Sequence, residues 1–426
     1  MPRVKKPSAA EALAHPREFS LLVNIAKDGE APREVLLKAS QEYGDEALAA
    51  ALGDEVEFAD FAKAFNKASQ LDAAAGEDGA NCLGWAARDS GAVLAPYKFK
   101  RRELGPKDVF VKITHAGMCH SDLHTINGDW QATFPVVPGH EIVGIVAAVG
   151  SEVTKFKVGD RAGVGTYVDS CRKCRECSMG DDQFCAECVF TYNAKHKDGL
   201  TSQGGYSSHI ITGEHYTFTV PDNLDMAGVA PLLCAGITTF SPYKLYGLDK
   251  PGLKIGVVGL GGLGHMAVKF GVAFGCEVYV ISRSRAKEPE ALAMGAKAVI
   301  PTNDEAAIKA MAGQLDGVID TVAAQHDFMP MFTMLRPKGK MCVVGAPPGD
   351  AKFPWFPVLF KSLTLCSSLV GTPGLTQEML DFCGAKNIVS DVEVITMDYA
   401  NEAYKRMEKG DVKFRFVIDI NKSLVA

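Results

Sequence analysis

Four cysteines at close and nearly regular spacing constrain this chain more than any other feature of its sequence. The segment CRKCRECSMGDDQFC places Cys171, Cys174, Cys177 and Cys185 with two, two and seven residues between them. Four thiolates that short loops bring together can close a tetrahedral shell around Zn²⁺ and leave no position for a substrate. Cys188 follows Cys185 by another two-residue gap and is an alternative fourth ligand. The spacing predicts a structural zinc site, with Cys185 as the favoured fourth ligand.

A second set of metal-ligating residue types is spread along the chain. Cys119 lies in GMCHSDLH, His140 in PGHE and Cys234 in PLLCAG. An open catalytic zinc site takes about three protein ligands, typically of mixed type, and keeps one position free. Residue chemistry alone leaves a second interpretation open, in which Cys234 is a small core residue and His140 lies at the surface.

Length, charge and hydropathy exclude several classes of protein. A chain of 426 residues predicts two or three domains. The net charge of −6 argues against a general nucleic-acid binder, and no apolar run approaches the roughly 20 residues of a membrane span. Twelve cysteines in metal-ligand patterns, with no signal peptide ahead of them, favour a reducing compartment. We therefore expect a cytoplasmic protein that binds neither nucleic acid nor a membrane.

Residues 1–80 differ from the rest of the chain. They are Ala-rich, and their apolar residues recur at helical spacing in PREVLLKASQEYGDEALAAAL and EFADFAKAFNKAS. Their many carboxylates argue against an organelle transit peptide. We expect short amphipathic helices followed by a flexible linker, AAAGEDGAN, at residues 73–81. This extension either has no chemistry of its own or binds a partner through its apolar face.

The segment GLGGLG (residues 259–264) matches the dinucleotide-binding pattern GxGxxG in the context that this pattern requires. It follows an apolar strand at 253–258 and opens a helix at 265–274. The first glycine permits a tight turn, the second lets the backbone approach a pyrophosphate, and the third lets helix and strand pack closely. The free N–H groups at the start of the helix attract the same anion. The predicted cofactor-binding residues of the turn are Gly259, Gly261, Gly262, Leu263 and Gly264.

The end of the next predicted strand indicates which dinucleotide binds. An NAD site places an acidic residue roughly 20 residues beyond the glycines. Here the strand at 277–281 is followed by SRSRAK, which contains no carboxylate. Hydroxyl groups and cations can hold a phosphate at that position, although a solvated basic turn is the alternative. We therefore expect NADP(H), with its phosphate held by Ser282, Arg283, Ser284 and Lys287.

Several motifs resemble one enzyme family. GHEIVGIVAAVGSEV (residues 139–153) resembles the zinc signature of the medium-chain zinc alcohol dehydrogenases. GMCHSDLH, VFTYN (189–193) and PLLCAGITTFSP (231–242) are similar to the cinnamyl alcohol dehydrogenase branch, and the resemblance begins near residue 82. It implies an α/β fold in which a Rossmann-type doubly wound parallel sheet joins a β-rich GroES-like catalytic domain. The implied domains are a helical extension and linker (1–80), a zinc-binding catalytic domain (82–232 and 370–426) and an NADP-binding domain (233–369), with homodimers formed edge to edge by the cofactor-domain sheets.

The resemblance also implies roles for individual residues. Cys119, His140 and Cys234 correspond to the ligands of a catalytic zinc, which makes two zinc ions per chain. Ser121 resembles the hydroxyl beside that zinc, and His124 resembles the relay that passes protons to solvent. Asp122 resembles the residue that orients the zinc-bound histidine, and Glu141 the carboxylate that approaches zinc while water or substrate exchanges.

Substrate-lining residues follow from the same resemblance. Trp130 and Phe190 occupy positions where the branch lines its pocket, and aromatic faces suit a flat conjugated aldehyde. We expect reversible reduction of aromatic or cinnamyl-type aldehydes to primary alcohols. Members specific for phenylpropanoids usually carry tryptophan where this chain has Phe190, which leaves a broad reductase of aliphatic or toxic aldehydes as the alternative. A non-catalytic redox or scaffold protein and a zinc-free quinone reductase are further rivals that the cysteine clusters disfavour.

Overall fold

The computed structural model describes residues 79–91, 93–346 and 349–424. The helices expected in the N-terminal extension lie outside these residues, as does most of the expected linker. The described residues fall in two units, the smaller of which takes residues 79–83 and Leu94–Lys100. It contains the strand β2 (Ala95–Phe99), which pairs with β1 (Cys82–Ala86). The larger unit holds every predicted site residue.

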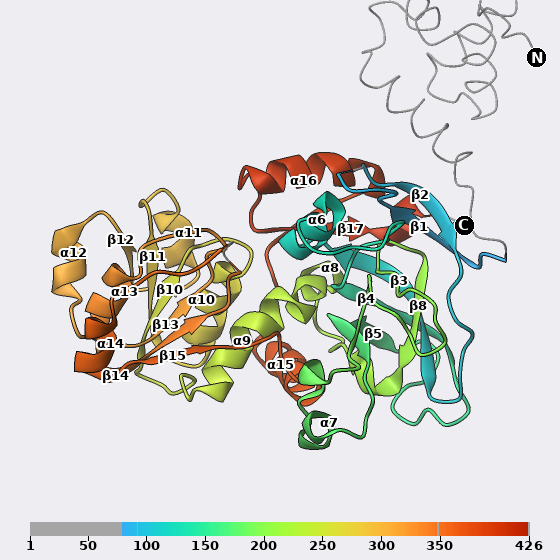
Figure 1. Ribbon diagram of the computed structural model, residues 1–426, viewed down its shortest axis with the longest axis horizontal. Helices are drawn as coiled ribbons and strands as arrows, with labels where there is room; N and C mark the ends of the chain where they lie inside the picture. Colours follow the sequence, from blue (N-terminus) through green and yellow to red (C-terminus); the bar gives the residue numbers. More distant parts are fainter. Residues whose placement is uncertain (1–78, 92, 347–348, 425–426) are drawn as a thin grey trace, which may run out of the picture. The chain divides into compact units, whose positions relative to one another are not determined.

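The first part of the larger unit is built around a mixed seven-stranded sheet (Figure 1). Its order is β16-β17-β3-β4-β5-β9, with β8 also paired to β3. Gly144 of β4 pairs with Ile113 of the antiparallel neighbour β3, and a Cβ there would come within 2.2 Å of the Lys112 carbonyl oxygen. The strands are β3 (Asp108–Gly117), β4 (Ile142–Val149), β5 (Arg161–Val164), β8 (His209–Gly213), β9 (Thr217–Thr219), β16 (Val392–Ile395) and β17 (Arg415–Asp419).

Short helices and a small hairpin surround this sheet. Strands β6 (Tyr167–Asp169) and β7 (Val189–Phe190) pair with each other and flank the cysteine-rich segment. The helices are α6 (His120–Asn127), α7 (Arg175–Met179), α8 (Met226–Val229), α15 (Pro373–Lys386), α16 (Ala400–Glu408) and α17 (Ile420–Ser423), with 3₁₀ turns η2 (Asp182–Phe184), η3 (Glu214–Tyr216), η4 (Ala230–Leu233) and η5 (Met397–Tyr399).

The second part is a six-stranded, all-parallel sheet in the order β12-β11-β10-β13-β14-β15. Numbered along the chain, these strands run 3-2-1-4-5-6, which is the order of a Rossmann fold. The order reverses between β10 and β13, and ligands of such sheets bind at that point, beyond the carboxyl ends of the strands. The strands are β10 (Lys254–Val258), β11 (Glu277–Ser282), β12 (Ala298–Pro301), β13 (Leu315–Asp320), β14 (Leu335–Val343) and β15 (Thr364–Ser367).

Both faces of the parallel sheet are covered, and the side-chain alternation of the strands divides the core in two. Ile255 and Val257 of β10 pack in one apolar cluster with Phe270, whereas Val258 packs in the other with Phe332. The helices of this part are α9 (Ala235–Leu245), α10 (Gly264–Ala273), α11 (Glu288–Ala293), α12 (Glu305–Ala310), α13 (Met329–Met334) and α14 (Trp355–Lys361).

The C-terminal strand β17 returns to the first sheet, where it lies between β16 and β3. Its five residues are all buried, so this late segment is an internal strand of the seven-stranded sheet. None of the helices in the described parts of the chain has the length and apolarity needed to cross a membrane.

Candidate active site

Cys119, His140 and Cys234 come together from three separate elements. Cys119 is the residue before α6, His140 lies two residues before β4, and Cys234 directly precedes α9. The Sγ atoms of the two cysteines are 3.9 Å apart, and Nε2 of His140 is 3.1 Å from Sγ of Cys234. With a carboxylate oxygen of Glu141, all four ligand atoms lie within 4.8 Å of one another, and all four residues are buried. This arrangement can hold a metal ion.

Asp122 fixes the orientation of His140. Its Oδ1 is 3.0 Å from Nδ1 of His140 and accepts a hydrogen bond from the backbone N–H of Gly139, while its Oδ2 accepts from the N–H of Cys119. Since a carboxylate draws the imidazole proton to Nδ1, Nε2 is left as the lone-pair nitrogen that faces the sulfur atoms. Asp122 is fully buried, so the first turn of α6 rigidly couples two of the cluster residues.

The chemistry of the cluster fits zinc. Two thiol sulfurs and one imidazole nitrogen form a mixed donor set of the kind found in catalytic zinc sites. Hydrogen bonding from Cys234 lowers the pKa of the Cys119 thiol well below its usual value, and His140 acts in the same direction against the effect of burial. Oε2 of Glu141 is buried and has no hydrogen-bond partner among the described residues. An unpartnered buried carboxylate oxygen beside two thiols is a position that a cation would satisfy.

Glu141 is also paired with Arg415 of β17. The guanidinium and carboxylate form a buried ion pair. Burial raises the pKa of Glu141 to about 7, although Arg415 acts to lower it. Arg415 also lies against the glycine turn, because a Cβ added to Gly262 would come within 2.7 Å of its Cδ atom. One side chain therefore contacts both the metal-ligand cluster and the predicted cofactor turn.

Ser121 and His124 lie on α6, one turn apart. Oγ of Ser121 is 3.6 Å from Sγ of Cys119. Nδ1 of His124 is 2.8 Å from Oδ2 of Asp129, and the imidazole stacks on Trp130 with ring centroids 5.0 Å apart. Asp129 thus favours the tautomer whose Nε2 is free to accept a proton.

The two predicted pocket aromatics are both partly exposed. Trp130 is 46% exposed and contacts His124. Phe190 is 43% exposed and pairs with Tyr167 across the small hairpin. Tyr192, which lies two residues beyond Phe190, is buried and its ring is 5.7 Å from that of His140.

The cysteine-rich segment forms a second cluster. The sulfur atoms of Cys171, Cys174, Cys177 and Cys185 lie within 4.8 Å of one another, and this group does not include Cys188. Backbone N–H groups point at three of these sulfurs, with N–S distances of 3.3–3.5 Å. Such donors stabilise thiolates. Burial raises the pKa of Cys188 to about 12.

The glycine turn between β10 and α10 has the geometry of a dinucleotide-binding turn. Gly259 has φ of +85°, and a Cβ at Gly264 would lie 2.1 Å from the Gly259 carbonyl oxygen. A Cβ at Gly261 would meet no atom within 4 Å, so its backbone is open to a ligand. Leu263 directly precedes the first residue of α10. The backbone geometry at the three glycines is compatible with the turn, the open approach and the close packing that their spacing predicts.

The end of β11 lies close to this turn. Ser282 is the last residue of the strand, and Arg283 and Ser284 beyond it are exposed. Nζ of Lys287 is 3.1 Å from the carbonyl oxygen of Leu260 in the glycine turn. Arg285 instead pairs with Glu288. The carboxylate of Glu288 therefore pairs with Arg285 and with none of the four residues that are predicted to hold a phosphate.

Two family models match the chain in sequence. The alcohol dehydrogenase GroES-like domain matches residues 105–222, and the zinc-binding dehydrogenase family matches residues 262–385. Cinnamyl alcohol dehydrogenase 2 of Rauvolfia serpentina is 50% identical over 344 residues, which cover 80% of this chain and 96% of that protein. The chain belongs to the zinc-dependent medium-chain alcohol dehydrogenases. Its similarities lie in the cinnamyl alcohol dehydrogenase branch of that family.

Solved structures agree with this assignment. A cinnamyl alcohol dehydrogenase of Sorghum bicolor is 47% identical, with a TM-score of 0.79 over 81% of this chain and 99% of that one. A Helicobacter pylori enzyme of the same class, solved with NADP(H), is 39% identical with a TM-score of 0.75 over 80% of this chain and 99% of that one. The predicted family, enzyme class and α/β fold, with its GroES-like and Rossmann-type parts, are thereby confirmed.

Sequence reasoning missed two residues of this dehydrogenase's site. Arg415 lies 274 residues from Glu141 in the sequence, and nothing in KFRFVIDI distinguishes it from an ordinary strand residue. Asp129 lies only five residues from His124. A carboxylate just past the end of α6 and so close in sequence to a predicted relay histidine could have indicated this contact.

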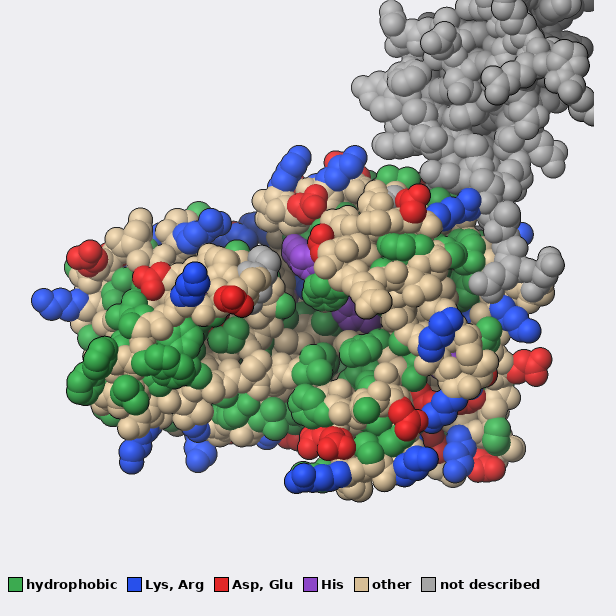
Figure 2. Space-filling view, viewed as in Figure 1, with side chains coloured by type: hydrophobic (Ala, Val, Ile, Leu, Met, Phe, Trp, Pro, Cys, Tyr) green, Lys and Arg blue, Asp and Glu red, His purple; other side chains and the backbone are tan. Residues whose placement is uncertain are grey.

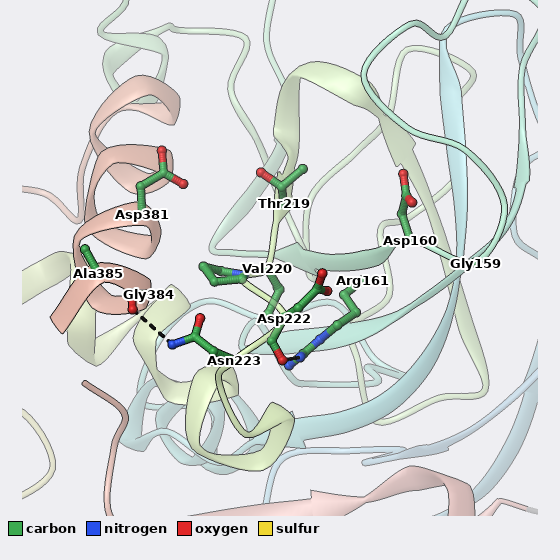
Figure 3. A pocket seen from close by; sticks show the side chains of 11 residues that line it. Gly159, Asp160, Arg161, Thr219, Val220, Asp222, Asn223, Asp381, Gly384 and Ala385 are labelled. Atoms are coloured by element: carbon green, nitrogen blue, oxygen red, sulfur yellow. Dashed lines mark hydrogen bonds between the residues drawn. The ribbon is translucent and has the colours of Figure 1, made fainter. Parts of the chain in front are cut away.

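Two cavities in the part that is built around the seven-stranded sheet lie apart from the cluster of Cys119, His140 and Cys234. One, of about 690 Å³, lies between Arg161 and the helix α15, where the Asn223 amide donates to the Gly384 carbonyl oxygen (Figure 3). The other, of about 920 Å³, is lined by mixed charges that include Lys155 and Glu214. Within the described residues, neither cavity is lined by a predicted site residue.

Proposed function

We propose that this chain is a zinc-dependent, NADP(H)-linked alcohol dehydrogenase that reversibly reduces aromatic or cinnamyl-type aldehydes to primary alcohols. The observation that carries the proposal is the buried cluster of Cys119, His140 and Cys234, which Arg415 and Glu141 connect to the glycine turn. This chemistry would need a metal site for the carbonyl oxygen next to a hydride donor for the carbonyl carbon, and the two sets of binding residues are neighbours here.

Cys119, His140 and Cys234 would hold the catalytic zinc. When bound, this ion supplies a Lewis acid for the carbonyl oxygen of the substrate. Asp122 keeps Nε2 of His140 available as a ligand. Glu141 supplies a buried carboxylate near the ligand atoms, and the Arg415 guanidinium balances its charge.

Ser121 and His124 would move the proton that the product alcohol needs. Ser121 lies beside the cluster, and its hydroxyl can donate to an oxygen bound there. His124 then restores the proton from solvent, because Asp129 holds its Nδ1 and leaves Nε2 as the exchanging nitrogen. Both side chains act as general acids during reduction and as bases during oxidation.

The glycine turn would bind the cofactor pyrophosphate through Gly259, Gly261, Gly262, Leu263 and Gly264. Ser282, Arg283, Ser284 and Lys287 would hold the additional phosphate of NADP(H). The absence of a carboxylate at the end of β11 supports this preference. The similar Helicobacter pylori enzyme was solved with NADP(H), which also supports it.

A broad-specificity reductase of aliphatic or toxic aldehydes is the second candidate. Phe190 stands where phenylpropanoid-specific members usually have tryptophan. Trp130 and Phe190 would line the pocket in either case. Relatives with similar identity include a probable mannitol dehydrogenase of Fragaria ananassa (51%) and an 8-hydroxygeraniol dehydrogenase of Catharanthus roseus (50%). The different substrates in these names support a family in which the catalytic residues are shared and the substrate pocket differs from one enzyme to another.

Steady-state oxidation of NADPH and NADH with cinnamaldehyde and with hexanal tests the proposal. We expect turnover with NADPH and a higher kcat/KM for cinnamaldehyde. A large preference for hexanal favours the broad reductase. Absence of turnover with every aldehyde, in protein that retains its zinc, refutes both candidates. Cys119→Ala is expected to abolish turnover and leave the protein folded.

A second, structural zinc would be held by Cys171, Cys174, Cys177 and Cys185. A metal count of two per chain, falling to one in Cys119→Ala, tests both sites together. We retain the proposed domain division: extension (1–80), catalytic domain (82–232 and 370–426) and cofactor domain (233–369). The cysteine usage supports a cytoplasmic, reducing location.

A homodimer through the cofactor domains completes the proposal. Within the described residues, β15 is an edge strand of the parallel sheet. Trp355, Phe356, Leu359 and Phe360 of the neighbouring helix α14 are 63–84% exposed, and Figure 2 shows hydrophobic side chains gathered over that end of the cofactor domain. Exposed aromatic side chains of this number mark an interaction surface. Sedimentation analysis tests the dimer, and a monomer at micromolar concentration would contradict it.

A further inference from the structure

A buried aspartate at the end of β13 holds a histidine that follows it in the sequence. Asp320 is the last residue of β13 and is fully buried. Its Oδ2 is 2.9 Å from Nε2 of His326, and its Oδ1 accepts a hydrogen bond from the backbone N–H of Val322. Nδ1 of His326 lies 2.8 Å from the carbonyl oxygen of Ala324. These contacts close residues 321–326, which we call the β13 loop, onto the strand from which they emerge.

The contact between the two side chains requires one extra proton. The Ala324 carbonyl oxygen and the Asp320 carboxylate both only accept hydrogen bonds, and both contact the imidazole of His326. The pair therefore shares one proton beyond those of a neutral imidazole and a carboxylate, whichever side chain carries it. Burial raises the pKa of Asp320, while the Val322 N–H and His326 act to lower it. Loss of the histidine would leave a buried carboxylate without its partner, so the pair holds the β13 loop firmly.

The β13 loop packs directly against the glycine turn. The Thr321 hydroxyl donates to the carbonyl oxygen of Val258, the residue before Gly259, over 2.7 Å. A Cβ at Gly259 would come within 3.0 Å of Cγ2 of Val322, and a Cβ at Gly264 within 3.2 Å of the Thr321 hydroxyl oxygen. Contacts this close tie the position of the turn to that of the loop.

The pair lies at the switch point of the parallel sheet. Asp320 is directly opposite Val258 in the register of β13 with β10, and the strand order reverses between these two strands. Ligands of doubly wound sheets bind at this point, beyond the carboxyl ends of the strands. The strand β11, which leads into Arg283, lies on the other side of β10. Asp320 and His326 are therefore beside the cofactor turn but away from the residues predicted to hold the additional phosphate.

We propose that Asp320 and His326 are positioning residues for the dinucleotide. They fix the β13 loop against Gly259 and so hold the glycine turn in its binding conformation before the cofactor arrives. A binding site that is ordered in advance loses less conformational entropy on binding and therefore has a higher affinity. Because the pair lies away from Arg283, it strengthens the binding of NADPH and NADH alike. Since the ligand is the cofactor of the proposed function, this inference rests on that function.

Titration of the zinc-loaded, full-length protein with NADPH and with NADH tests the proposal. Binding is followed by the fluorescence of the reduced nicotinamide, so no turnover is needed. His326→Phe removes both ring nitrogens and keeps an aromatic ring beside Phe328, whose ring centroid is 4.9 Å from that of His326. We expect the Kd for both cofactors to rise about tenfold, as for the loss of a charge-assisted hydrogen bond. The ratio of the two Kd values should stay as in the wild type, whereas Arg283→Asp should change that ratio.

Substitutions of Asp320 separate the hydrogen bonds of the pair from the shape of the site. In Asp320→Asn, the amide oxygen can accept from the Val322 N–H, and the amide nitrogen can donate to Nε2 of a neutral His326. This variant should bind NADPH as the wild type does. Asp320→Ala loses both contacts and should bind as weakly as His326→Phe. Since His326→Phe leaves a buried carboxylate unpaired, the double variant Asp320→Asn/His326→Phe, which has no charge there, is measured beside it and should show the same loss.

The outcomes distinguish a failure of this inference from a failure of the proposed function. If the wild type binds neither NADPH nor NADH, the proposed cofactor is wrong and the inference falls with it. If the wild type binds NADPH, and His326→Phe and the double variant bind it equally well, the inference alone is overturned. Weak binding by Asp320→Asn, equal to that of Asp320→Ala, also overturns it, because the hydrogen bonds of the pair would then not control the loop.

Discussion

His265, on the cofactor helix α10, makes the stability of this dehydrogenase depend on pH. Its side chain is fully buried. Nδ1 lies 3.1 Å from the Gly261 carbonyl oxygen and Nε2 lies 3.0 Å from Oγ of Ser390. A neutral imidazole satisfies both contacts, with one nitrogen as donor and the other as acceptor. Burial, followed by the charge of Lys269, lowers the pKa of His265 from its ordinary 6.5 to about 3.

The sign and size of the effect follow from this shift. Since the pKa is depressed in the folded state, only the unfolded chain takes up a proton as the pH falls through 6.5. The stabilisation from neutral His265 is fully present above that pH and is lost progressively down to about pH 3. Each pH unit costs about 1.4 kcal/mol. Moving from about pH 7.5 to about pH 5 therefore removes about 2 kcal/mol of unfolding free energy through this one group.

Urea unfolding of the wild type and of His265→Gln at the two pH values measures this contribution. Glutamine keeps a donor and an acceptor but does not titrate. Taking the difference between the proteins cancels the titration of every other histidine and carboxylate. We expect the wild type to lose about 2 kcal/mol more than the variant between the two pH values. If the pH dependence of the two proteins agrees within about 0.5 kcal/mol, the reasoning from burial is wrong.

Three further predictions concern the cysteine-rich cluster, the cofactor and the proton relay. Cys174→Ala should remove one zinc per chain and lower the thermal midpoint, because a structural metal site contributes directly to folding; an unchanged midpoint would contradict that role. Arg283→Asp should raise KM for NADPH much more than for NADH, and an unchanged ratio would place the phosphate elsewhere. Asp129→Asn should lower kcat roughly tenfold, because the His124 proton would no longer be held on Nδ1. A loss of this size does not exceed what general acid–base catalysis contributes. In that variant an unaltered pH–rate profile would show that Asp129 does not act through His124.

The sequence predicted those parts of the site whose signals are local. The spacing of Cys171, Cys174, Cys177 and Cys185 is a property of one short segment, and the structure brings their sulfur atoms together. The glycine turn is likewise local, because a strand, a tight turn and a helix follow one another directly. The elements that the periodicity indicated agree with the structure to within a few residues, as at β10 and α10.

Contacts that depend on the path of the whole chain could not be predicted in the same way. Residue chemistry alone left Cys119, His140 and Cys234 open to a simpler interpretation, and only the resemblance connected them. Arg415 was missed because its importance comes from pairing with Glu141, and that pairing is created by the insertion of β17 into a sheet built mainly from much earlier segments.

The position of β17 has a consequence for how the enzyme is made in the cell. The strand occupies an interior place in its sheet and carries Arg415, yet it is translated after every other strand of the two sheets. The parallel sheet can form while synthesis continues, because all six of its strands lie in an uninterrupted earlier stretch. The neighbourhood of Glu141 is completed only after residue 415 has left the ribosome. A nascent chain therefore carries its glycine turn before it has a finished catalytic centre.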